Sequence, residues 1–365
     1  MQYTISVIPG DGIGPELVKS SKRLLSKVGE ELDSKIYFDE FKFGNTAVQN
    51  GLPPSSQDSI NECTSNDAIL LGNVWLKDLS GKSSPHEVNA FLGQIRKALG
   101  VYANIRPIMS YKSLFERSPL RDNKLIDCIF IREMSEGMLS SDHKKSKNKS
   151  GKDTAIDYEY YDEDAIRKVS DLSIKIALQR NKQIINVDKA IVLASSQLWR
   201  KILYDDIAIN DESSIKLLNM FVDDVASDLI INPDKYNVIL TTGMFGDILS
   251  DELATLTGTP QILASIEEGV NNKGLYSPLQ LHNSNEEIVG TNKVNPLGIL
   301  SATSWLVRMS LNQSDLADQI DFSISHFINK WGMGAINQKH FTTEEITTNI
   351  IQNIDRGDIN SETIR

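Results

Sequence analysis

Two aspartates set four residues apart are the part of this sequence best suited to chemistry. Asp247 and Asp251 lie in the run Phe-Gly-Asp-Ile-Leu-Ser-Asp-Glu at residues 245–252. A helical run would place both carboxylates on one face, where they repel each other unless a cation lies between them. Mg²⁺ and Mn²⁺ prefer carboxylate ligands, so the pair would supply half of a metal site. The alternative is a solvated acidic helix start, stabilised by the helix dipole.

Short apolar runs that alternate with helical periodicity predict the elements that position these acids. Pro15 stands at a favoured first position of a helix, and Leu17, Leu24, Leu25 and Val28 then recur at helical spacing. Buried strands are predicted at residues 5–8, 68–72, 126–131, 183–187 and 238–241. This alternation indicates an α/β fold with a largely parallel sheet.

Length and composition indicate a globular protein of two domains. The chain has 365 residues, of which 40% are hydrophobic and 24% charged, whereas single cores rarely exceed about 300 residues. The formal net charge of −11 argues against a nucleic-acid partner. No apolar stretch reaches the roughly 18 residues that span a membrane. Met1 leads almost directly into a strand-like segment at residues 3–8, with no leader pattern, so we expect a cytoplasmic protein with no membrane partner.

Two further groups of residues favour structural or solvated roles. Cys63 and Cys128 lie far apart and form no metal-type pair, so we expect both to be reduced and structural. Residues 140–157 carry five lysines among polar residues, at positions 144, 145, 147, 149 and 152. We interpret this segment, with its lysine-rich part at 141–152, as a mobile solvated loop rather than a site for an anionic partner.

Six motifs spread along nearly the whole chain carry a family resemblance. They are residues 8–16 (Ile-Pro-Gly-Asp-Gly-Ile-Gly-Pro-Glu), 102–107 (Tyr-Ala-Asn-Ile-Arg-Pro), 131–133 (Ile-Arg-Glu), 187–190 (Val-Asp-Lys-Ala), 222–223 (Val-Asp) and 245–252. In that order and at those separations the sequence resembles the metal-dependent β-decarboxylating dehydrogenases, which form the isocitrate/isopropylmalate dehydrogenase family. The run at 245–252 is the specific signature among them.

The resemblance implies a two-domain α/β fold that differs from the ordinary Rossmann fold, with the active site between the domains. The first, cofactor-side domain would combine residues 1–101 and 257–365 around a mostly parallel sheet. The second would span residues 102–256 and carry the dimer contact and an arm. A homodimer with shared active sites is implied, because two site residues would serve the neighbouring subunit.

The resemblance also assigns metal and catalytic residues. Asp247 and Asp251 would hold Mg²⁺ or Mn²⁺ together with Asp223 of the partner subunit. Lys189, also supplied by the partner, would help to deprotonate the substrate hydroxyl, since a nearby metal lowers the pKa of a lysine. The implied reaction transfers hydride from C2 of the substrate to a nicotinamide, after which the β-keto acid loses CO₂.

Substrate binding is implied for three arginines, whose guanidinium groups pair bidentately with carboxylates and stay charged: Arg96, Arg106 and Arg132. They would grip a malate-type 2-hydroxy acid, and Leu92 would suit an isopropyl group. The Ser and Asn pair of isocitrate enzymes is missing ahead of Arg96. The leading substrate is therefore 3-isopropylmalate, ahead of D-malate or tartrate.

The cofactor site is implied mainly by residues 281–290, which are similar to the adenosine loop of the family. Glu287 stands where an acid in NAD-specific members meets the adenosine ribose, and an acid there would repel a 2′-phosphate, so NAD is favoured over NADP. The cofactor-binding residues implied are Ile13, His282, Asn283, Ser284, Glu287 and Asn295.

One departure from the family pattern concerns the final proton transfer. Leu139 stands where the family has a tyrosine that protonates the enolate carbon after decarboxylation. A nearby tyrosine at position 158, 160 or 161, or a water, would have to substitute, or this step is slow or lost. The sequence therefore keeps a second hypothesis open, a catalytically impaired paralogue that binds a ligand or serves a regulatory role.

Overall fold

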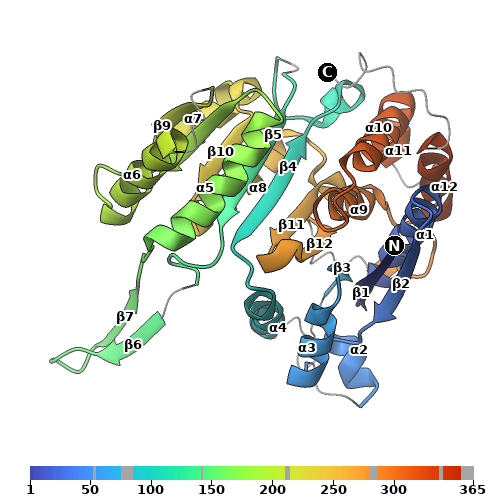
Figure 1. The fold of residues 1–365 in the computed structure, drawn as a ribbon, viewed down its shortest axis with the longest axis horizontal. Helices are drawn as coiled ribbons and strands as arrows, with labels where there is room; N and C mark the ends of the chain where they lie inside the picture. Colours follow the sequence, from blue (N-terminus) through green and yellow to red (C-terminus); the bar gives the residue numbers. More distant parts are fainter. Residues whose placement is uncertain are drawn as a thin grey trace. The chain divides into compact units, whose positions relative to one another are not determined.

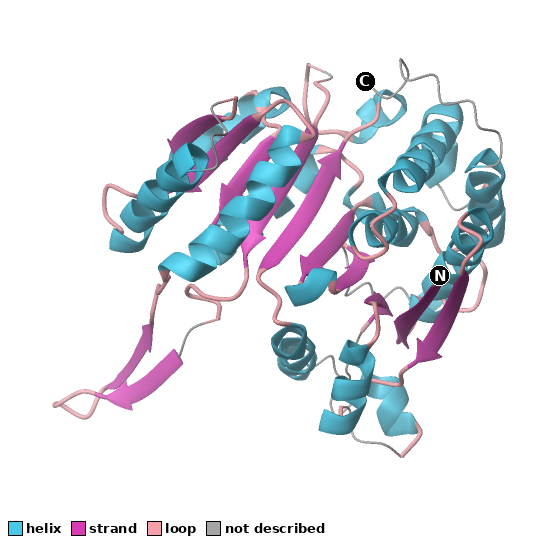
Figure 2. Cartoon of the chain, in the orientation of Figure 1, coloured by secondary structure: helices cyan, strands magenta, loops and turns pink. Residues whose placement is uncertain are grey.

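The computed structural model describes residues 1–51, 55–74, 85–122, 124–140, 143–209, 214–279, 286–336 and 340–354 (Figure 1). Contacts divide the chain into two compact units. Unit 1 contains Met1–Val101, Ser110–Pro119 and Gly258–Arg365, and unit 2 contains Tyr102–Met109 and Leu120–Thr257. Each unit has its own set of strands covered by helices, as the colouring by secondary structure shows (Figure 2).

Unit 1 is built on five strands in the order β2-β1-β3-β12-β11. Their bounds are Gln2–Gly10 (β1), Lys35–Glu40 (β2), Ala68–Asn73 (β3), Ala264–Glu268 (β11) and Gly274–Pro278 (β12). β1 pairs parallel to β2 and β3, β12 pairs parallel to β3, and β11 runs antiparallel to β12. The sheet is therefore mostly parallel, and its buried strands are nearly continuous apolar runs.

The helices of unit 1 begin with α1 (Gly14–Glu31), which buries the predicted stripe of Leu17, Leu24, Leu25 and Val28. Gly10 lets the chain turn from β1 into this helix. Its φ is +69°, and a Cβ there would lie 1.8 Å from the carbonyl oxygen of Asn73, so only glycine fits. The other helices are α2 (Gly44–Gln49), α3 (Gln57–Ser65), α4 (Pro85–Leu99), α9 (Leu297–Met309), α10 (Ser314–Trp331), α11 (Met333–Ile336) and α12 (Thr343–Ile354), with short 3₁₀ turns η1 (Lys112–Arg117), η3 (Pro260–Ile262), η4 (Val270–Asn272) and η5 (Glu286–Ile288).

Unit 2 contains a second set of five strands in the order β4-β5-β10-β8-β9. Their bounds are Ala103–Met109 (β4), Asp127–Glu133 (β5), Gln183–Asp188 (β8), Lys216–Phe221 (β9) and Val238–Thr241 (β10). β5, β10, β8 and β9 are parallel neighbours, whereas β4 is antiparallel to β5. The carboxyl ends of four strands thus meet at one edge, where the amino end of β4 also lies. Parallel α/β sheets bind ligands beyond this edge.

Helices cover both faces of the unit 2 sheet. α5 (Glu163–Leu178) and α6 (Ala194–Ile209) lie on one face, and α7 (Val222–Ile231) and α8 (Gly243–Leu256) lie on the other (Figure 1). A short 3₁₀ turn, η2 (Pro233–Lys235), follows α7. The inner strands β5, β10 and β8 are buried on both sides as a result.

The lysine-rich segment is a β-hairpin, so the prediction of a loop there was wrong. β6 (His143–Lys147) and β7 (Asp153–Asp157) pair antiparallel and extend beyond α5 within unit 2 (Figure 2). Side chains on the two strands are joined by hydrogen bonds, between His143 and Asp157 at 2.7 Å and between Ser146 and Thr154 at 2.7 Å. The lysines are exposed as expected, but a backbone ladder and cross-strand pairs order the segment without an apolar core.

The predicted strands and the α/β class with a largely parallel sheet are confirmed. Both cysteines are free and buried, as expected, and burial raises the pKa of the Cys63 thiol to about 12. Among the described residues, no helix is long and apolar enough to cross a membrane.

Candidate functional site

The two aspartates of the signature run lie on α8, as the spacing predicted. α8 buries Leu249 and Leu253, which leaves Asp247 and Asp251 on a more open face with 50% and 66% of their side chains exposed. They lie one turn apart, because residues four positions apart are neighbours on a helix. The carboxylates of both aspartates face arginine side chains, and these arginines belong to strands of the same unit.

Arg106, on β4, binds both aspartates. Its Nη1 donates to Asp251 Oδ1 at 2.5 Å and its Nη2 to Asp247 Oδ1 at 3.3 Å. Nη1 also donates to the Ser250 hydroxyl at 2.7 Å, and Nε donates to Asn104 Oδ1 at 3.1 Å. Only 13% of the arginine side chain is exposed. The guanidinium is therefore held across one turn of α8 by charge-assisted hydrogen bonds, of which those to Asp251 and Ser250 are short.

Arg132, on β5, completes this cluster. Its guanidinium makes an ion pair with Asp247, and only 7% of its side chain is exposed. The antiparallel register places Asn104 of β4 directly opposite Arg132, so side chains at 104, 106 and 132 share one face. We call Arg106, Arg132, Asp247 and Asp251 the Arg–Asp cluster. Two nearly buried cations thus balance two exposed carboxylates.

Lys189 and Asp223 form a second pair at the same edge of the unit 2 sheet. Lys189 directly follows β8 and Asp223 lies in the first turn of α7, which directly follows the neighbouring strand β9. Their side chains make an ion pair, and the Lys189 ammonium lies 5.6 Å from the centre of the Phe221 ring. The hydrogen bond from Lys189 holds the pKa of Asp223 below its usual range. The family resemblance assigned both residues to the active site of the neighbouring subunit, and within this chain the two side chains lie together.

The donor set of α8 suits a divalent metal but is incomplete by itself. Asp247 and Asp251 offer carboxylate oxygens from adjacent turns of one helix, which hard cations prefer. Within the described part of the chain, no group of three or more His, Cys, Asp or Glu side chains is placed to hold a metal ion. Further ligands would have to come from water, from a bound substrate or from another chain.

A turn rich in carboxylates follows Arg132 and leads toward the hairpin. The buried carboxyl of Glu133 accepts from Ser135 N at 2.7 Å, from Glu136 N at 3.1 Å and from the Ser135 hydroxyl. Burial raises the pKa of Glu133 to about 7, even though these hydrogen bonds oppose the shift. The Glu136 carboxylate in turn accepts from Asp162 N at 2.7 Å. The backbone after β5 is therefore fixed close to the Arg–Asp cluster.

Leu139 lies in this turn near the start of α8, with 51% of its side chain exposed. Its Cδ1 is 3.8 Å from where a Cβ of Gly243 would be. The Tyr161 hydroxyl accepts from Gly243 N at 3.3 Å and is 6% exposed, whereas Tyr158 and Tyr160 are 43% and 57% exposed. Burial, reinforced by nearby glutamates, raises the pKa of Tyr161, so its phenol stays protonated. Of the three tyrosines, Tyr161 is the one bonded to α8.

Arg96 and Leu92, predicted to bind substrate, lie on α4 in unit 1. Arg96 makes a bidentate pair with Glu267 of β11, through Nε to Oε2 at 2.7 Å and Nη2 to Oε1 at 2.6 Å. The Glu267 side chain is almost fully buried, and Leu92 is buried as well. Arg96 therefore neutralises a buried carboxylate within its own unit, a contact that the sequence interpretation missed.

The predicted cofactor residues that the structure describes also belong to unit 1. Ile13 is buried at the start of α1, and Glu287 is exposed in η5. The Asn295 amide donates to Ala335 O at 3.0 Å and accepts from Leu297 N at 3.0 Å, so this side chain fixes the start of α9. His282, Asn283 and Ser284 lie outside the described residues.

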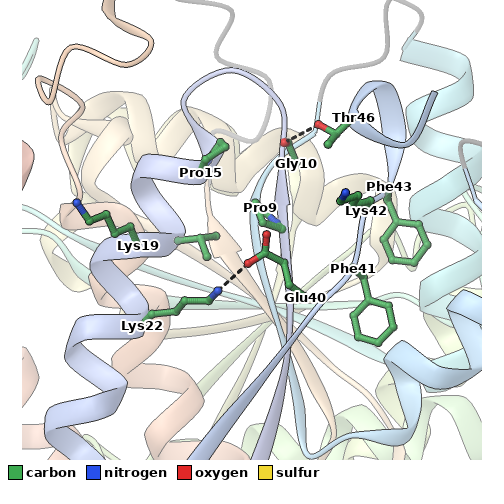
Figure 3. Close-up of a pocket in the computed structure, with 11 residues that line it drawn as sticks. Pro9, Gly10, Pro15, Lys19, Lys22, Glu40, Phe41, Lys42, Phe43 and Thr46 are labelled. Atoms are coloured by element: carbon green, nitrogen blue, oxygen red, sulfur yellow. Dashed lines mark hydrogen bonds and ion pairs between the residues drawn. The ribbon is translucent and has the colours of Figure 1, made fainter. Parts of the chain in front are cut away.

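Unit 1 also contains a pocket of about 330 Å³ (Figure 3). Its lining comes from β1, α1 and the end of β2 with the residues that follow. Across it Lys22 pairs with Glu40 at 2.7 Å, while the Thr46 hydroxyl donates to Gly10 O at 3.1 Å. None of the residues predicted for substrate, metal or cofactor lines it.

Two contributors to the Arg–Asp cluster were within the quoted motifs but were not singled out. Ser250, on α8, and Asn104, on β4, each accept a hydrogen bond from the Arg106 guanidinium. Ser250 is three residues after Asp247, and Asn104 is two residues before Arg106. Helical and strand periodicity put each on the same face as its charged neighbour, which is the signal that could have found them.

Comparison with known proteins gives one family. The model of the family described as isocitrate/isopropylmalate dehydrogenase matches residues 4–353. A 3-isopropylmalate dehydrogenase of Clostridium pasteurianum is 35% identical over 336 residues, covering 90% of this chain and 92% of that protein. The 3-isopropylmalate dehydrogenase of Listeria monocytogenes serotype 4b (strain F2365) is 32% identical over 98% of this chain and 100% of its own.

Solved structures agree with this match. A β-decarboxylating dehydrogenase from Thermococcus kodakarensis, in its apo form, has a TM-score of 0.74 and 26% identity, and covers 100% of this chain and 99% of its own. An isocitrate dehydrogenase from Methylococcus capsulatus has a TM-score of 0.77 at 23% identity, with 96% and 99% covered, and shares the fold. The chain belongs to the isocitrate/isopropylmalate dehydrogenase family.

Proposed function

We propose that this protein catalyses the NAD-dependent oxidative decarboxylation of a malate-type 2-hydroxy acid, with 3-isopropylmalate as its substrate. The Arg–Asp cluster carries the proposal. Two guanidinium groups that suit substrate carboxylates lie against two aspartates that suit a divalent metal, all in one unit. The relatives named 3-isopropylmalate dehydrogenase support the choice of substrate over D-malate and tartrate.

The metal assigned to this site is Mg²⁺ or Mn²⁺, with Asp247 and Asp251 as ligands from one subunit. When bound, such an ion supplies positive charge beside the reacting hydroxyl and the developing enolate oxygen. Arg106 and Arg132 would orient the substrate carboxylates from β4 and β5. Because both side chains are largely buried, they lose little freedom on binding and hold the acid in one geometry.

Lys189 and Asp223 are assigned to the active site of the neighbouring subunit in a homodimer. Asp223 would complete the metal ligands there, and Lys189 would take the proton of the substrate hydroxyl. Their ion pair within one subunit supports a shared role, since it holds the ammonium and the carboxylate at the same place. Unit 2 would then carry the dimer contact, with the β6–β7 hairpin as its arm.

NAD is assigned to unit 1, with Ile13, Glu287 and Asn295 among the residues that would contact it. The exposed acid at Glu287 supports NAD over NADP, because a ribose hydroxyl can donate to it and a 2′-phosphate is repelled. The domain division that accompanies this assignment is residues 1–101 plus 257–365 for the cofactor and 102–256 for the dimer contact. A cytoplasmic location suits a substrate and cofactor of this kind.

The final proton transfer is assigned to Tyr161 in place of a phenol at Leu139. The Tyr161 hydroxyl accepts a hydrogen bond from the first residue of α8, and Leu139 lies beside that same residue. A water beside the exposed Leu139 would carry the proton from this phenol to the substrate. Tyr161→Phe should then slow product formation more than hydride transfer, and Leu139→Tyr should relieve that loss.

The deciding experiment is NADH formation with Mn²⁺ and a panel of 3-isopropylmalate, D-malate, tartrate and isocitrate. We expect turnover with 3-isopropylmalate and a clear preference for NAD over NADP. Binding of an acid without turnover of any of the four would instead support the second function, a ligand-binding or regulatory paralogue, which the leucine at position 139 favours.

A further inference from the structure

In the Arg–Asp cluster, the substrate carboxylates and the two aspartates would compete for the same two arginine side chains. Arg106 and Arg132 are the groups proposed to bind substrate carboxylates, yet they pair with Asp247 and Asp251, the groups proposed to bind the metal. The Nη1 atom of Arg106 already donates to both Asp251 and Ser250. The two guanidinium groups can therefore donate fully to the carboxylates of a bound acid only after Asp247 and Asp251 lose some of their hydrogen bonds to the arginines.

Burial makes this competition unequal between the two kinds of residue. The arginine side chains are 13% and 7% exposed, whereas those of Asp247 and Asp251 are 50% and 66% exposed. An exposed carboxylate can exchange its arginine partner for water or for a cation. A largely buried guanidinium that loses its carboxylate remains an uncompensated charge, which is costly until another anion replaces it.

We infer that the cluster works as a partner exchange that couples metal binding to anion binding, an inference that rests on the proposed function. A divalent cation draws Asp247 and Asp251 away from the guanidinium groups, which then require a dicarboxylate. Without the cation, the aspartates occupy the arginines and suppress binding of the acid. The coupling passes through this chain's own side chains and is additional to any direct contact between cation and acid.

The sharp test removes a carboxylate instead of adding a cation. Asp251→Asn should act as a partial mimic of the metal-bound state, because Arg106 loses one of its two carboxylate partners while Asp247 and the side-chain volume at position 251 are kept. The probe is succinate, which has two carboxylates but no hydroxyl group for chelation, titrated calorimetrically in EDTA without NAD. The matched control is Asp224→Asn, which makes the same charge change at an exposed aspartate of α7 outside the cluster.

We expect Asp251→Asn to bind succinate about tenfold more tightly than the wild type without metal, a coupling within the usual range between linked sites. Asp224→Asn should stay within about twofold of the wild type, because salt screens the effect of an exposed charge outside the cluster. Mn²⁺ should tighten succinate binding to the wild type by a similar factor and should have a smaller effect on Asp251→Asn. Succinate should in turn tighten Mn²⁺ binding to the wild type, which electron paramagnetic resonance of free Mn²⁺ measures.

The exchange is wrong if Asp251→Asn, with an unchanged urea midpoint, binds succinate no more tightly than Asp224→Asn. It is equally wrong if Mn²⁺ tightens succinate binding to both proteins by the same factor, because the coupling would then be direct. These measurements involve no turnover and no nicotinamide. A failure of the proposed reaction, seen as absent NADH, is therefore distinguishable from a failure of the exchange.

Discussion

A methyl group at Gly246 would lie 2.8 Å from the Cβ of Arg132 and 2.9 Å from the Cγ2 of Thr241. Helix α8 therefore touches β5 and β10 at the residue just before Asp247, and the missing side chain sets that distance. Both neighbours are anchored in strands, so they have little room to move. The closeness of helix and sheet is what brings the Asp247 carboxylate to the Arg132 guanidinium.

Gly246→Ala should consequently destabilise the protein by about 1–3 kcal/mol, the usual cost of overpacking a tight contact. The change should also weaken Mn²⁺ binding, because α8 must shift to make room. Gly93→Ala is the matched control, since a Cβ there meets nothing within 4 Å and lies on α4. Replacing that helical glycine should instead stabilise the protein by about 0.5–1 kcal/mol. Urea unfolding of the two variants measures both effects, and equal stability of Gly246→Ala and wild type would contradict the packing argument.

Glu133→Gln should change how stability depends on pH. Burial raises the pKa of Glu133 to about 7 from the unfolded value of 4.5. The folded protein therefore binds more protons than the unfolded chain between these values. The stabilising contribution of this carboxyl is fully present below the unfolded pKa and is lost as pH rises through about 7. The loss is on the order of 3 kcal/mol across that window.

Urea unfolding at pH 5 and pH 8 checks this, with the exposed Glu62→Gln as control. Glu133→Gln should lose much less stability between the two pH values than the wild type, because an amide does not ionise. Glu62→Gln should follow the wild type. A pH dependence of Glu133→Gln that equals that of the control would show that this carboxyl ionises without cost in the folded state.

Lys189→Ala should raise the pKa of Asp223 toward its ordinary value. The hydrogen bond from the Lys189 ammonium is the main cause of the lowered pKa, so its removal should raise the pKa, while the hydrogen bond from the backbone N–H of Asp223 continues to favour the carboxylate. Lys189→Arg should keep the pKa low, since it retains a cationic donor. Carbon-detected NMR titration of the carboxyl group is the measurement. We also expect turnover to fall by about 10²–10⁴ in Lys189→Ala, as for loss of a general base.

Variants of Arg96 can distinguish a structural role of this residue from a role in substrate binding. Arg96→Ala should cost about 3 kcal/mol, because it leaves the nearly buried Glu267 carboxylate without its bidentate partner. Adding Glu267→Gln should restore most of that stability by removing the uncompensated charge. If Arg96 also binds substrate, the double variant should keep a raised KM although it is stable. A KM that returns to the wild-type value would assign Arg96 to the structural role alone.

The elements with regular patterns could be predicted from the sequence. The apolar runs gave the buried strands, the stripe of leucines gave α1, and the spacing of Asp247 and Asp251 correctly placed both acids on one helical face. These are local properties, because the period of hydrophobic residues reports the geometry of one element at a time. The pairing of Lys189 with Asp223 followed only from resemblance, since 34 residues separate them in the chain.

Other features depended on which elements meet, and no local pattern contains that information. The β6–β7 hairpin has no apolar face and is built on cross-strand pairs, so its composition resembled that of a loop. The Arg–Asp cluster requires the antiparallel register of β4 on β5, and the Arg96–Glu267 pair requires α4 to meet β11. The arginines were predicted to bind a substrate, but their carboxylate partners in the protein itself were not foreseen. The roles assigned to these residues remain predictions.

The antiparallel register of β4 on β5 determines on which face of the strand pair the two arginines lie. Asn104 lies opposite Arg132 and Arg106 lies opposite Phe130, so one face of the ribbon holds both arginines. A slip of one residue would turn Arg106 to the other face while leaving the apolar strands paired. A molecule caught in that slipped state would be compact yet unable to gather its charged groups. The register of this one strand pair therefore decides whether both arginines lie on the same face.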